Sequence, residues 1–217
     1  MNNPAYLVEG DLEQKFIQNA CPTAAVQKIN CNGETTSIEA IVKRVGTLGR
    51  LLHKRFSPLV VIFDRENRQE TVAEIEKEFH EHMVHEKIDV PIIVGIPDEN
   101  IETWILSDYE MFLQSAGLGE SSPVGTFEGK NGKSVIKNML PHGRSYVETI
   151  DGVTWLKAAR PLFIKNSSAS FARLFAKLTK FECWWLQQLQ LPLQANEING
   201  LNGSDSPTEN RPPTAAG

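Results

Sequence analysis

The sequence predicts an α/β protein with a parallel sheet flanked by helices and followed by a C-terminal helical cap. Two observations support this fold class. Short apolar runs alternate with longer segments of helical periodicity through the first half of the chain, and such alternation is typical of parallel sheets. Two of the runs, PLVVIF and VPIIVGI, are apolar almost throughout, as expected for strands that are buried on both faces.

The elements of the first half follow from local patterns. The run AYLV stops at Glu9, and Asp11 can cap the helix that follows. Ser37 can cap the next helix, whose apolar residues recur at helical spacing. The third helix has one apolar stripe, as an amphipathic surface helix has. The expected strands are 5–8, 26–29, 58–63 and 90–96, and the expected helices are 11–20, 37–55, 69–86 and 100–107.

The second half has a different character. Gly, Ser and Pro are frequent over 116–132, which predicts a loop. Helices are expected at 134–140, 153–159 and 168–180, and from about residue 192 the chain lacks the apolar residues that a core requires. The predicted organisation is an α/β domain over 1–115, a helical extension over 116–190 and a disordered tail over 191–217.

The composition is that of an ordinary globular protein. Of 217 residues, 41% are hydrophobic and 23% are charged, and the net charge is −5. No run approaches the ~18 apolar residues of a membrane span, and the N-terminus does not resemble a signal peptide. Three cysteines without C-x-x-C spacing predict reduced thiols. We therefore expect a cytoplasmic protein with no membrane partner, and the acidic balance argues against coating nucleic acid with the whole surface.

Carboxylates follow three of the four expected strands. In an open parallel sheet, ligands bind outside the carboxyl ends of the strands, so these acids are candidates for one shared site. The candidates are Glu9 and Glu13 after the first strand, Asp64 and Glu66 after the third, and Glu102 and Asp108 after the fourth.

Such a cluster predicts a bound cation. Grouped carboxylates repel one another unless a cation neutralises them, and Mg²⁺ or Mn²⁺ is the natural choice for oxygen ligands. Asp64 and Glu66 are two residues apart, so on an extended strand they lie ~6.5 Å apart on the same side. A site of this kind suits phosphoryl chemistry. The alternative interpretation is that acids simply favour loop starts and the first turns of helices.

Two segments, LVEGDLEQKF and VVIFDREN, resemble the signature of the Toprim domain. That signature is a strand ending in Glu-Gly, a helix, and a later hydrophobic strand ending in Asp-x-Asp. The domain occurs in topoisomerases, primases, overcoming-lysogenization-defect (OLD) nucleases and small repair proteins. The chain departs from the pattern at Glu66. The usual residue at this position is Asp, whose side chain is shorter than that of Glu. The pair Glu9 and Glu13 looks most like the OLD-type nucleases.

A narrower resemblance is to small stand-alone Toprim proteins associated with ATPases in bacterial defence loci. It rests on IPDENIETWILSD, GKSVIKNMLP, YVETIDG and SASFARLFAKL. The resemblance implies a Toprim-like sheet, a Mg²⁺- or Mn²⁺-dependent nuclease acting on DNA or RNA, and an ATPase partner in anti-phage defence. It implies that Glu9 is the catalytic or metal-binding glutamate and that Asp64 and Glu66 bind metal. Glu13, Glu102 and Asp108 are further metal candidates.

Cationic residues near these acids have two interpretations. The segment GKNGKS lacks the first glycine of a nucleotide-binding loop, since Phe127 stands there, so ATP binding is not expected. Its Lys133, a candidate catalytic residue, either contacts phosphate or belongs to a solvated face together with Lys130 and Lys137. Arg65 and Arg68 either bind a phosphate or neutralise the neighbouring acids.

Three functions remain open at this level. The leading hypothesis is a metal-dependent nuclease. The second is a catalytically silent Toprim module that binds or regulates an ATPase. The third is a small-molecule phosphohydrolase on a similar sheet, which would release phosphate from mononucleotides without cutting polymers.

Overall fold

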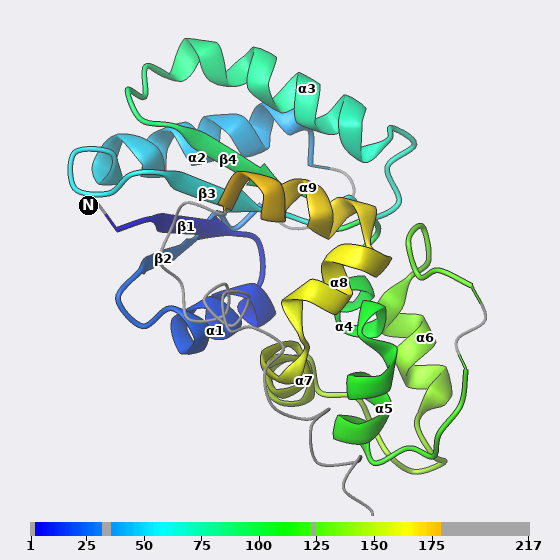
Figure 1. The fold of residues 1–217 in the computed structure, drawn as a ribbon. Coiled ribbons are helices and arrows are strands. Elements are labelled where there is room, and N and C mark those ends of the chain that lie inside the picture. The colour runs from blue at the N-terminus through cyan, green and yellow to red at the C-terminus, as the bar shows by residue number, and fades with distance from the viewer. Residues whose placement is uncertain (1–2, 32–35, 123–124, 179–217) are drawn as a thin grey trace, which may run out of the picture.

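The computed structural model describes residues 3–31, 36–122 and 125–178. At the centre of this part is a parallel sheet of four strands in the order β2-β1-β3-β4 (Figure 1). Its register aligns Val8 with Ile62 and Ile62 with Gly95, so the carboxyl ends of β1, β3 and β4 lie at one edge. The strands are β1 (Ala5–Val8), β2 (Ala25–Lys28), β3 (Leu59–Ile62) and β4 (Ile92–Gly95).

The helices of the first half are α1 (Asp11–Ala20), α2 (Ile38–Leu52), α3 (Val72–Met83) and α4 (Glu102–Ser107). The helices that follow are α5 (Tyr109–Ala116), α6 (Gly132–Met139), α7 (Val153–Ala158), α8 (Pro161–Ser167) and α9 (Ala169–Leu178). A 3₁₀ turn, η1 (Val84–Glu86), extends α3, and a π-helical turn, η2 (Glu148–Gly152), precedes α7.

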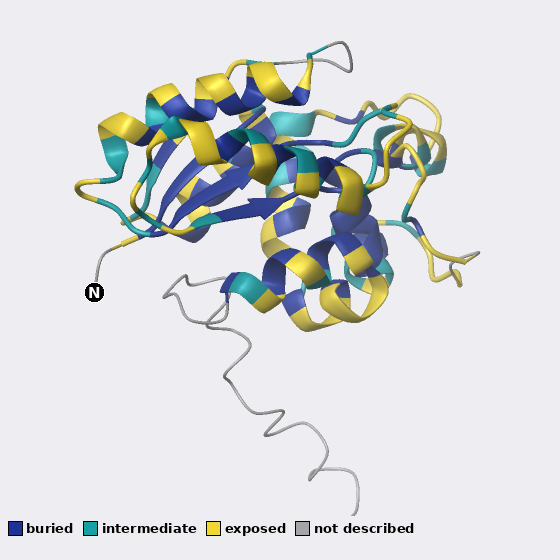
Figure 2. Cartoon of the chain, turned by 90° about the horizontal axis from the view of Figure 1, so that it is seen from above, coloured by how far each residue is buried: buried dark blue, intermediate teal, exposed yellow. Residues whose placement is uncertain are grey.

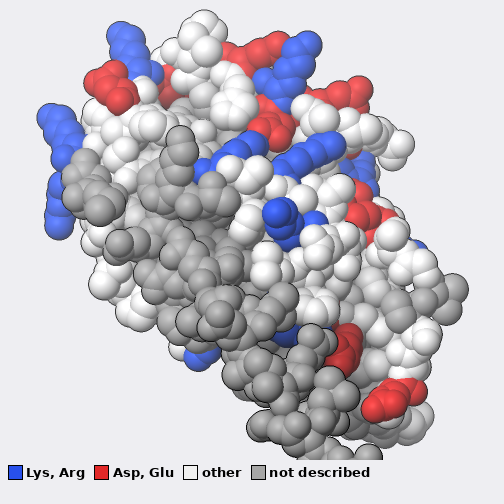
Figure 3. All heavy atoms as spheres, in the orientation of Figure 1, with Lys and Arg blue, Asp and Glu red and all other residues white. Residues whose placement is uncertain are grey.

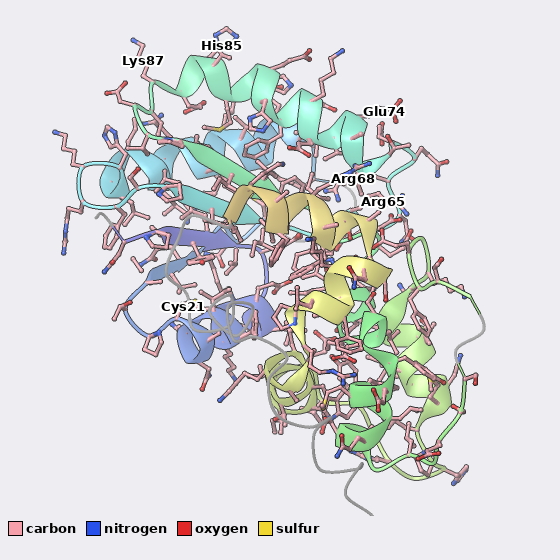
Figure 4. The ribbon with its side chains drawn as sticks, viewed as in Figure 1. Cys21, Arg65, Arg68, Glu74, His85 and Lys87 are labelled. Carbon is pink, nitrogen blue, oxygen red and sulfur yellow. The ribbon has the colours of Figure 1, made fainter. Side chains whose placement is uncertain are left out.

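All eight elements expected in the first half are present, with ends shifted by a few residues. The shift at α3 has a clear cause. Thr71 accepts a hydrogen bond from the Glu74 amide, and the Glu74 carboxylate accepts one from the Thr71 amide. This reciprocal capping box starts the helix at Val72 rather than at residue 69, and Glu74 lies at the beginning of α3 in Figure 4.

Both faces of the sheet are covered, as the uninterrupted apolar strands predict. Leu7, Val61 and Val94 pack with α2 and α3 in one hydrophobic cluster. Val8 and Val60 point to the other face, into a larger cluster with α1 and the later helices. Figure 2 shows the strands as buried between helices whose outer sides are exposed.

The later helices share the core of the sheet. Trp155, Ile164 and Phe171 belong to the same buried cluster as Val8 and Val60. Figure 1 shows α4 to α8 gathered beyond the carboxyl ends of the strands, while α9 returns across the sheet beside β4. The helical part thus forms one wall of the region into which the strands point.

Two further outcomes concern the cysteines and the chain's C-terminal part. Cys21 takes part in a disulfide, so the expectation of reduced thiols throughout is wrong, while Cys31 is a free thiol. The expected tail over 191–217 lies outside the described residues, as does the end of the helix expected over 168–180.

Among the helices that the structure describes, none has the length and hydropathy needed to cross a membrane.

Candidate metal centre at the carboxyl edge of the sheet

The ends of β1 and β3 place two of the predicted acids in direct contact. The Glu9 amide donates to the Ile62 carbonyl oxygen at 3.1 Å, which continues the pairing of the two strands. The Glu9 side chain then accepts a hydrogen bond through Oε2 from the Asp64 amide at 2.9 Å, although the two residues are 55 positions apart. The expected meeting of these two segments is therefore confirmed.

A cleft of about 280 Å³ opens at this contact. Its walls come from the ends of β1 and β3 and from the starts of α1, α4 and α6, together with η2. The ionisable residues that line it are Glu9, Asp11, Glu13, Asp64, Glu66, Glu102, Lys133 and Glu148. Five of the six predicted metal ligands and the predicted lysine thus share one cleft.

Several of these carboxylates are buried with an oxygen that has no partner. Glu102 is fully buried, and Asp64 is 8% exposed. Within the described residues, Asp64 Oδ1, Glu66 Oε2 and Glu102 Oε2 accept no hydrogen bond. An unsatisfied buried oxygen costs free energy, and all three belong to side chains that line the same cleft. They are the atoms that a hard cation would satisfy.

The pKa values of three acids in the cleft are raised, in the first place by burial and then by the negative charge of their neighbours. Burial, reinforced by Glu102 and Glu9, raises the pKa of Glu13 to about 7. Burial raises the pKa of Glu102 to about 7 as well, although nearby Lys133 opposes the rise. Burial and then the charges of Glu13, Glu102 and Glu9 raise the pKa of Asp64 well above its usual range. A bound cation would reverse these shifts.

The residue types of the cleft suit a hard cation, but their side chains are not arranged around one point. In the described part of the chain, no three His, Cys, Asp or Glu side chains already surround one point as metal ligands. The donors are nevertheless all carboxylates, as Mg²⁺ and Mn²⁺ prefer, and three of them present unpartnered oxygens. Side-chain rotation about the existing backbone positions is what a complete coordination shell would require.

Lys133 reaches the cleft because α6 packs closely against α4. The Gly132 amide donates to Asn100 Oδ1 at 3.1 Å, and a Cβ at Gly132 would lie 2.7 Å from the Thr103 amide nitrogen. Only glycine therefore allows this approach. Lys133 Nζ lies 3.2 Å from Glu148 Oε2.

The charge of Lys133 is retained in this setting. Burial lowers the pKa of the amine, but the charges of Glu102, Glu148 and Asp64 outweigh burial and raise the pKa above its ordinary value. Lys133 is therefore a fixed positive charge within a cluster of acids.

Arg65 and Arg68 hold the loop that carries Glu66. Arg65 pairs with Asp98 and Glu99 at 2.5 Å each, and Arg68 donates to the carbonyl oxygens of Asp64 and Arg65. Figure 4 shows both arginines close together beyond the end of β3. Arg65 therefore neutralises two acids of the loop after β4, rather than the pair Asp64 and Glu66 that it flanks in the sequence.

The same contacts explain the conformation of Glu66. Its φ is 53°, in the left-handed region, and its amide donates to the Glu99 carbonyl oxygen at 2.7 Å. This places Glu66 in a tight turn rather than on an extended strand, which corrects the expectation that Asp64 and Glu66 share one side of a strand.

Asp108 lies outside the cleft. It is 1% exposed and accepts hydrogen bonds from Arg160 Nε at 2.9 Å and Arg160 Nη2 at 2.7 Å. It also accepts from the Arg160 amide at 2.7 Å. Asp108 therefore joins α5 to the start of α8, and the prediction that it binds metal has no support in this arrangement.

Sequence reasoning assigned no role to two residues of the site. Glu148 lines the cleft and pairs with Lys133, and Tyr146 donates to Glu102 Oε1 at 3.0 Å. Both lie in YVETIDG, a segment whose only signal is its resemblance to the small Toprim proteins. No local pattern marks them, because their partners come from α4 and α6.

The charged surface outside the cleft is mixed. Lys43 pairs with Glu39 at 2.7 Å and Arg50 with Glu86 at 2.5 Å, so two basic side chains of α2 are neutralised. On the face drawn in Figure 3, basic and acidic side chains alternate along the upper edge, and several basic ones gather near the middle. The described surface offers no single basic track on that face.

The comparisons with known proteins place this architecture in one family. A family model described as "Domain of unknown function (DUF4276)" matches residues 8–179. Searches of curated proteins and of solved structures found no match. The matched span includes every residue that lines the cleft. On the strength of this match, which covers most of its length, the chain belongs to the DUF4276 family.

Proposed function

We propose that the protein is a Mg²⁺- or Mn²⁺-dependent nuclease of the Toprim type that hydrolyses phosphodiester bonds in DNA or RNA. The single observation that carries the proposal is the contact between Glu9 and Asp64 at the mouth of an acidic cleft. Unpartnered oxygens of Asp64, Glu66 and Glu102 support it further, since an acidic cleft with unsatisfied oxygens is destabilised until a cation binds.

In this proposal Glu9, Asp64, Glu66 and Glu102 hold the cation. When bound, the cation would supply Lewis-acid stabilisation of charge on the phosphate. The protein contributes a rigid frame, because Glu9 is tied to the Asp64 backbone and the Glu66 loop is tied down by Arg65. Preorganised groups of this kind need little rearrangement during reaction.

Two other side chains act directly on the substrate. Lys133 keeps its positive charge in the cleft and stabilises negative charge that develops on the phosphate. Glu13 lines the same cleft beside the proposed metal ligands. In the proposal its carboxylate accepts a proton from an attacking water and returns it to the leaving oxygen.

The proposed context is anti-phage defence together with an ATPase, as the resemblance implies, and the proposed location is the cytoplasm, as the composition predicts. The net charge of −5 and the acidic cleft repel a polyanion in the absence of metal. A partner that presents the nucleic acid would offset this repulsion. Dependence on a partner is therefore part of the proposal.

The test is cleavage by purified protein with Mn²⁺, in the presence and absence of the ATPase partner that the resemblance implies. Linear DNA, single-stranded RNA and transfer RNA serve as substrates. Asp64→Asn combined with Glu66→Gln should abolish cleavage, while Glu81→Gln, an exposed acid on α3, should retain it. Absence of cleavage with every substrate and with the cognate ATPase would contradict a nuclease.

The second candidate is a catalytically silent module that binds or regulates an ATPase. Two observations favour it: the described side chains form no closed ligand group, and Glu66 stands on a left-handed turn where the Toprim pattern has Asp. This candidate predicts that the Asp64→Ala and Glu66→Ala double variant still binds the ATPase and still protects cells against phage.

A further inference from the structure

A hydrogen bond from Tyr146 gives the two carboxylate oxygens of Glu102 different environments. Its hydroxyl donates to Glu102 Oε1 at 3.0 Å, and both residues are buried. The other oxygen of the same carboxylate, Oε2, accepts no hydrogen bond from the described residues. Tyr146 itself is not among the residues that line the cleft, whereas Glu102 is. The hydrogen bond therefore ties Oε1 to a group outside the cleft and leaves Oε2 available.

The position of the Tyr146 hydroxyl is tightly determined. The ring stacks on Trp155 with centroids 5.5 Å apart and planes inclined by 14°. Trp155 is itself 2% exposed and packs edge-on against Phe112. A Cβ at Gly152 would lie 2.5 Å from the hydroxyl oxygen. The absence of a side chain at Gly152 is thus what leaves room for this hydroxyl beside Glu102.

We infer that Tyr146 is a positioning residue that presents Glu102 to a cation through one oxygen only, and thereby selects Mg²⁺ or Mn²⁺ over Ca²⁺. The inference rests on the proposed metal site. Mg²⁺ takes six ligands at short distances, and a carboxylate that offers one oxygen suits it. Ca²⁺ takes six to eight ligands and gains from carboxylates that bind through both oxygens. Holding Oε1 away from the cleft removes one ligand that Ca²⁺ would use.

The test is calorimetric titration of the metal-free protein with MnCl₂ and, separately, with CaCl₂. In Tyr146→Phe the ring and its stacking remain while the hydroxyl is lost. Loss of an outer-shell partner lowers metal affinity by about tenfold or more, so the affinity for Mn²⁺ should fall by about that factor. The freed Oε1 becomes a ligand for Ca²⁺, so the ratio of the Ca²⁺ to the Mn²⁺ dissociation constant should fall by about tenfold.

Gly152→Ala is the second variant. It keeps Tyr146 but places a methyl carbon 2.5 Å from the hydroxyl oxygen, which displaces the hydroxyl from Glu102, so it should lower the same ratio. If Tyr146→Phe does not fold, the two dissociation constants of Gly152→Ala provide the test instead. Tyr109→Phe is the matched control, because that hydroxyl bonds to Ser121 at 2.9 Å and lies away from the acidic cleft.

The outcomes separate this inference from the proposed function. A wild-type protein that binds neither Mn²⁺ nor Ca²⁺ refutes the metal site and the inference with it. A wild-type protein that binds Mn²⁺, with variants that lose both metals equally, leaves the site in place and shows that Tyr146 is merely structural. Only a change in the ratio of the two constants, absent in Tyr109→Phe, supports selection by Tyr146.

Discussion

At the scale of single residues, the acids of the cleft are held in a setting that favours their neutral forms. The pKa of Glu13 and that of Glu102 are both raised to about 7, in the first place by burial. The usual value for a glutamate is 4.5. Each raised pKa makes stability depend on pH, because the folded chain keeps protons that the unfolded chain releases.

The first prediction is that the metal-free protein loses stability as pH rises from about 4.5 to about 7. Below this window both states hold the protons and the stabilisation is complete. Above it the folded state bears the full cost of charged, buried carboxylates, about 3 kcal/mol for one such group. Urea unfolding at a series of pH values measures this.

Mn²⁺ should restore the lost stability, and it should do so more at pH 8 than at pH 5.5, because only the deprotonated acids bind it. Replacing Glu13 and Glu102 by Gln should flatten the pH dependence. A stability that rises steadily between pH 4.5 and pH 7 would show that these groups are not buried as described.

The second prediction is that Asp64→Asn stabilises the metal-free protein while it removes the proposed metal binding. The amide removes one negative charge from a cluster in which Glu13, Glu102 and Glu9 raise the pKa of Asp64. We expect a gain of about 1 kcal/mol at pH 8, as is common when a functional site is relieved of strain. A shift of the urea midpoint to lower concentration would contradict this.

The residues of the site that follow directly after a predicted strand could be identified from the sequence. Glu9, Asp64 and Glu66 follow apolar strands, and Glu102 lies in the helix after the fourth strand. The carboxyl ends of parallel strands lie at one edge of the sheet, and that shared edge predicts that these acids meet. Glu148 and Tyr146 could not be predicted, because only tertiary packing brings Glu148 to Lys133 and Tyr146 to Glu102. Asp108 has the same residue type as the ligands, but its burial with Arg160 is visible only in three dimensions.

At the scale of elements, glycine governs how closely α6 approaches α4. A Cβ at Gly132 would meet the backbone nitrogen of Thr103 at 2.7 Å, and backbone cannot yield as a flexible side chain does. Gly132→Ala should therefore cost about 1–3 kcal/mol and displace Lys133 from the cleft.

Thermal unfolding measures the cost of Gly132→Ala. Gly119→Ala is its control, since a Cβ there would meet nothing within 4 Å. If both substitutions lowered stability equally, the close packing of α6 on α4 would not be the cause.

A further prediction concerns the junction of α4, α5 and α8. Asp108→Asn weakens two hydrogen bonds between a carboxylate and Arg160, and we expect a loss of roughly 2 kcal/mol. Metal affinity should not change, because Asp108 does not line the cleft. A parallel loss of Mn²⁺ binding, measured by calorimetry, would return Asp108 to the list of ligands.

The elements that escaped prediction are short and follow other elements directly. Neither α5, α8 nor η2 is predicted from the sequence. The helix α5 begins right after Asp108, which ends α4, and α8 begins at Pro161 within three residues of α7. Periodicity needs several turns to be recognised, so breaks between short helices are fixed by packing. The longer elements α1, α2 and α3 were predicted because their apolar faces repeat.

At the scale of the whole molecule, the sheet and the later helices depend on each other. Phe171 and Trp155 occupy the same core cluster as the strand residues Val8 and Val60. A fragment ending at residue 115 would expose this face of the sheet to water. We expect the fragment to lack a cooperative thermal transition by circular dichroism, whereas the full-length chain should show one.

The boundary expected near residue 115 coincides with a change in composition, because Gly, Ser and Pro become frequent after it. The sequence could not show that α9 returns to the sheet beside β4. If the fragment over 1–115 unfolded cooperatively, the two parts would be independent after all.

The cleft draws its walls from segments spread over most of the chain, from Glu9 near the N-terminus to Glu148 in η2. A ribosome that has made only the sheet has therefore produced the acids of β1 and β3 but neither Lys133 nor Glu148. The complete set of side chains meets only after the later helices have emerged and docked. If the protein cuts nucleic acid as proposed, a nascent chain gains that activity only after the helical segments that carry Lys133 and Glu148 have been translated and have packed against the sheet.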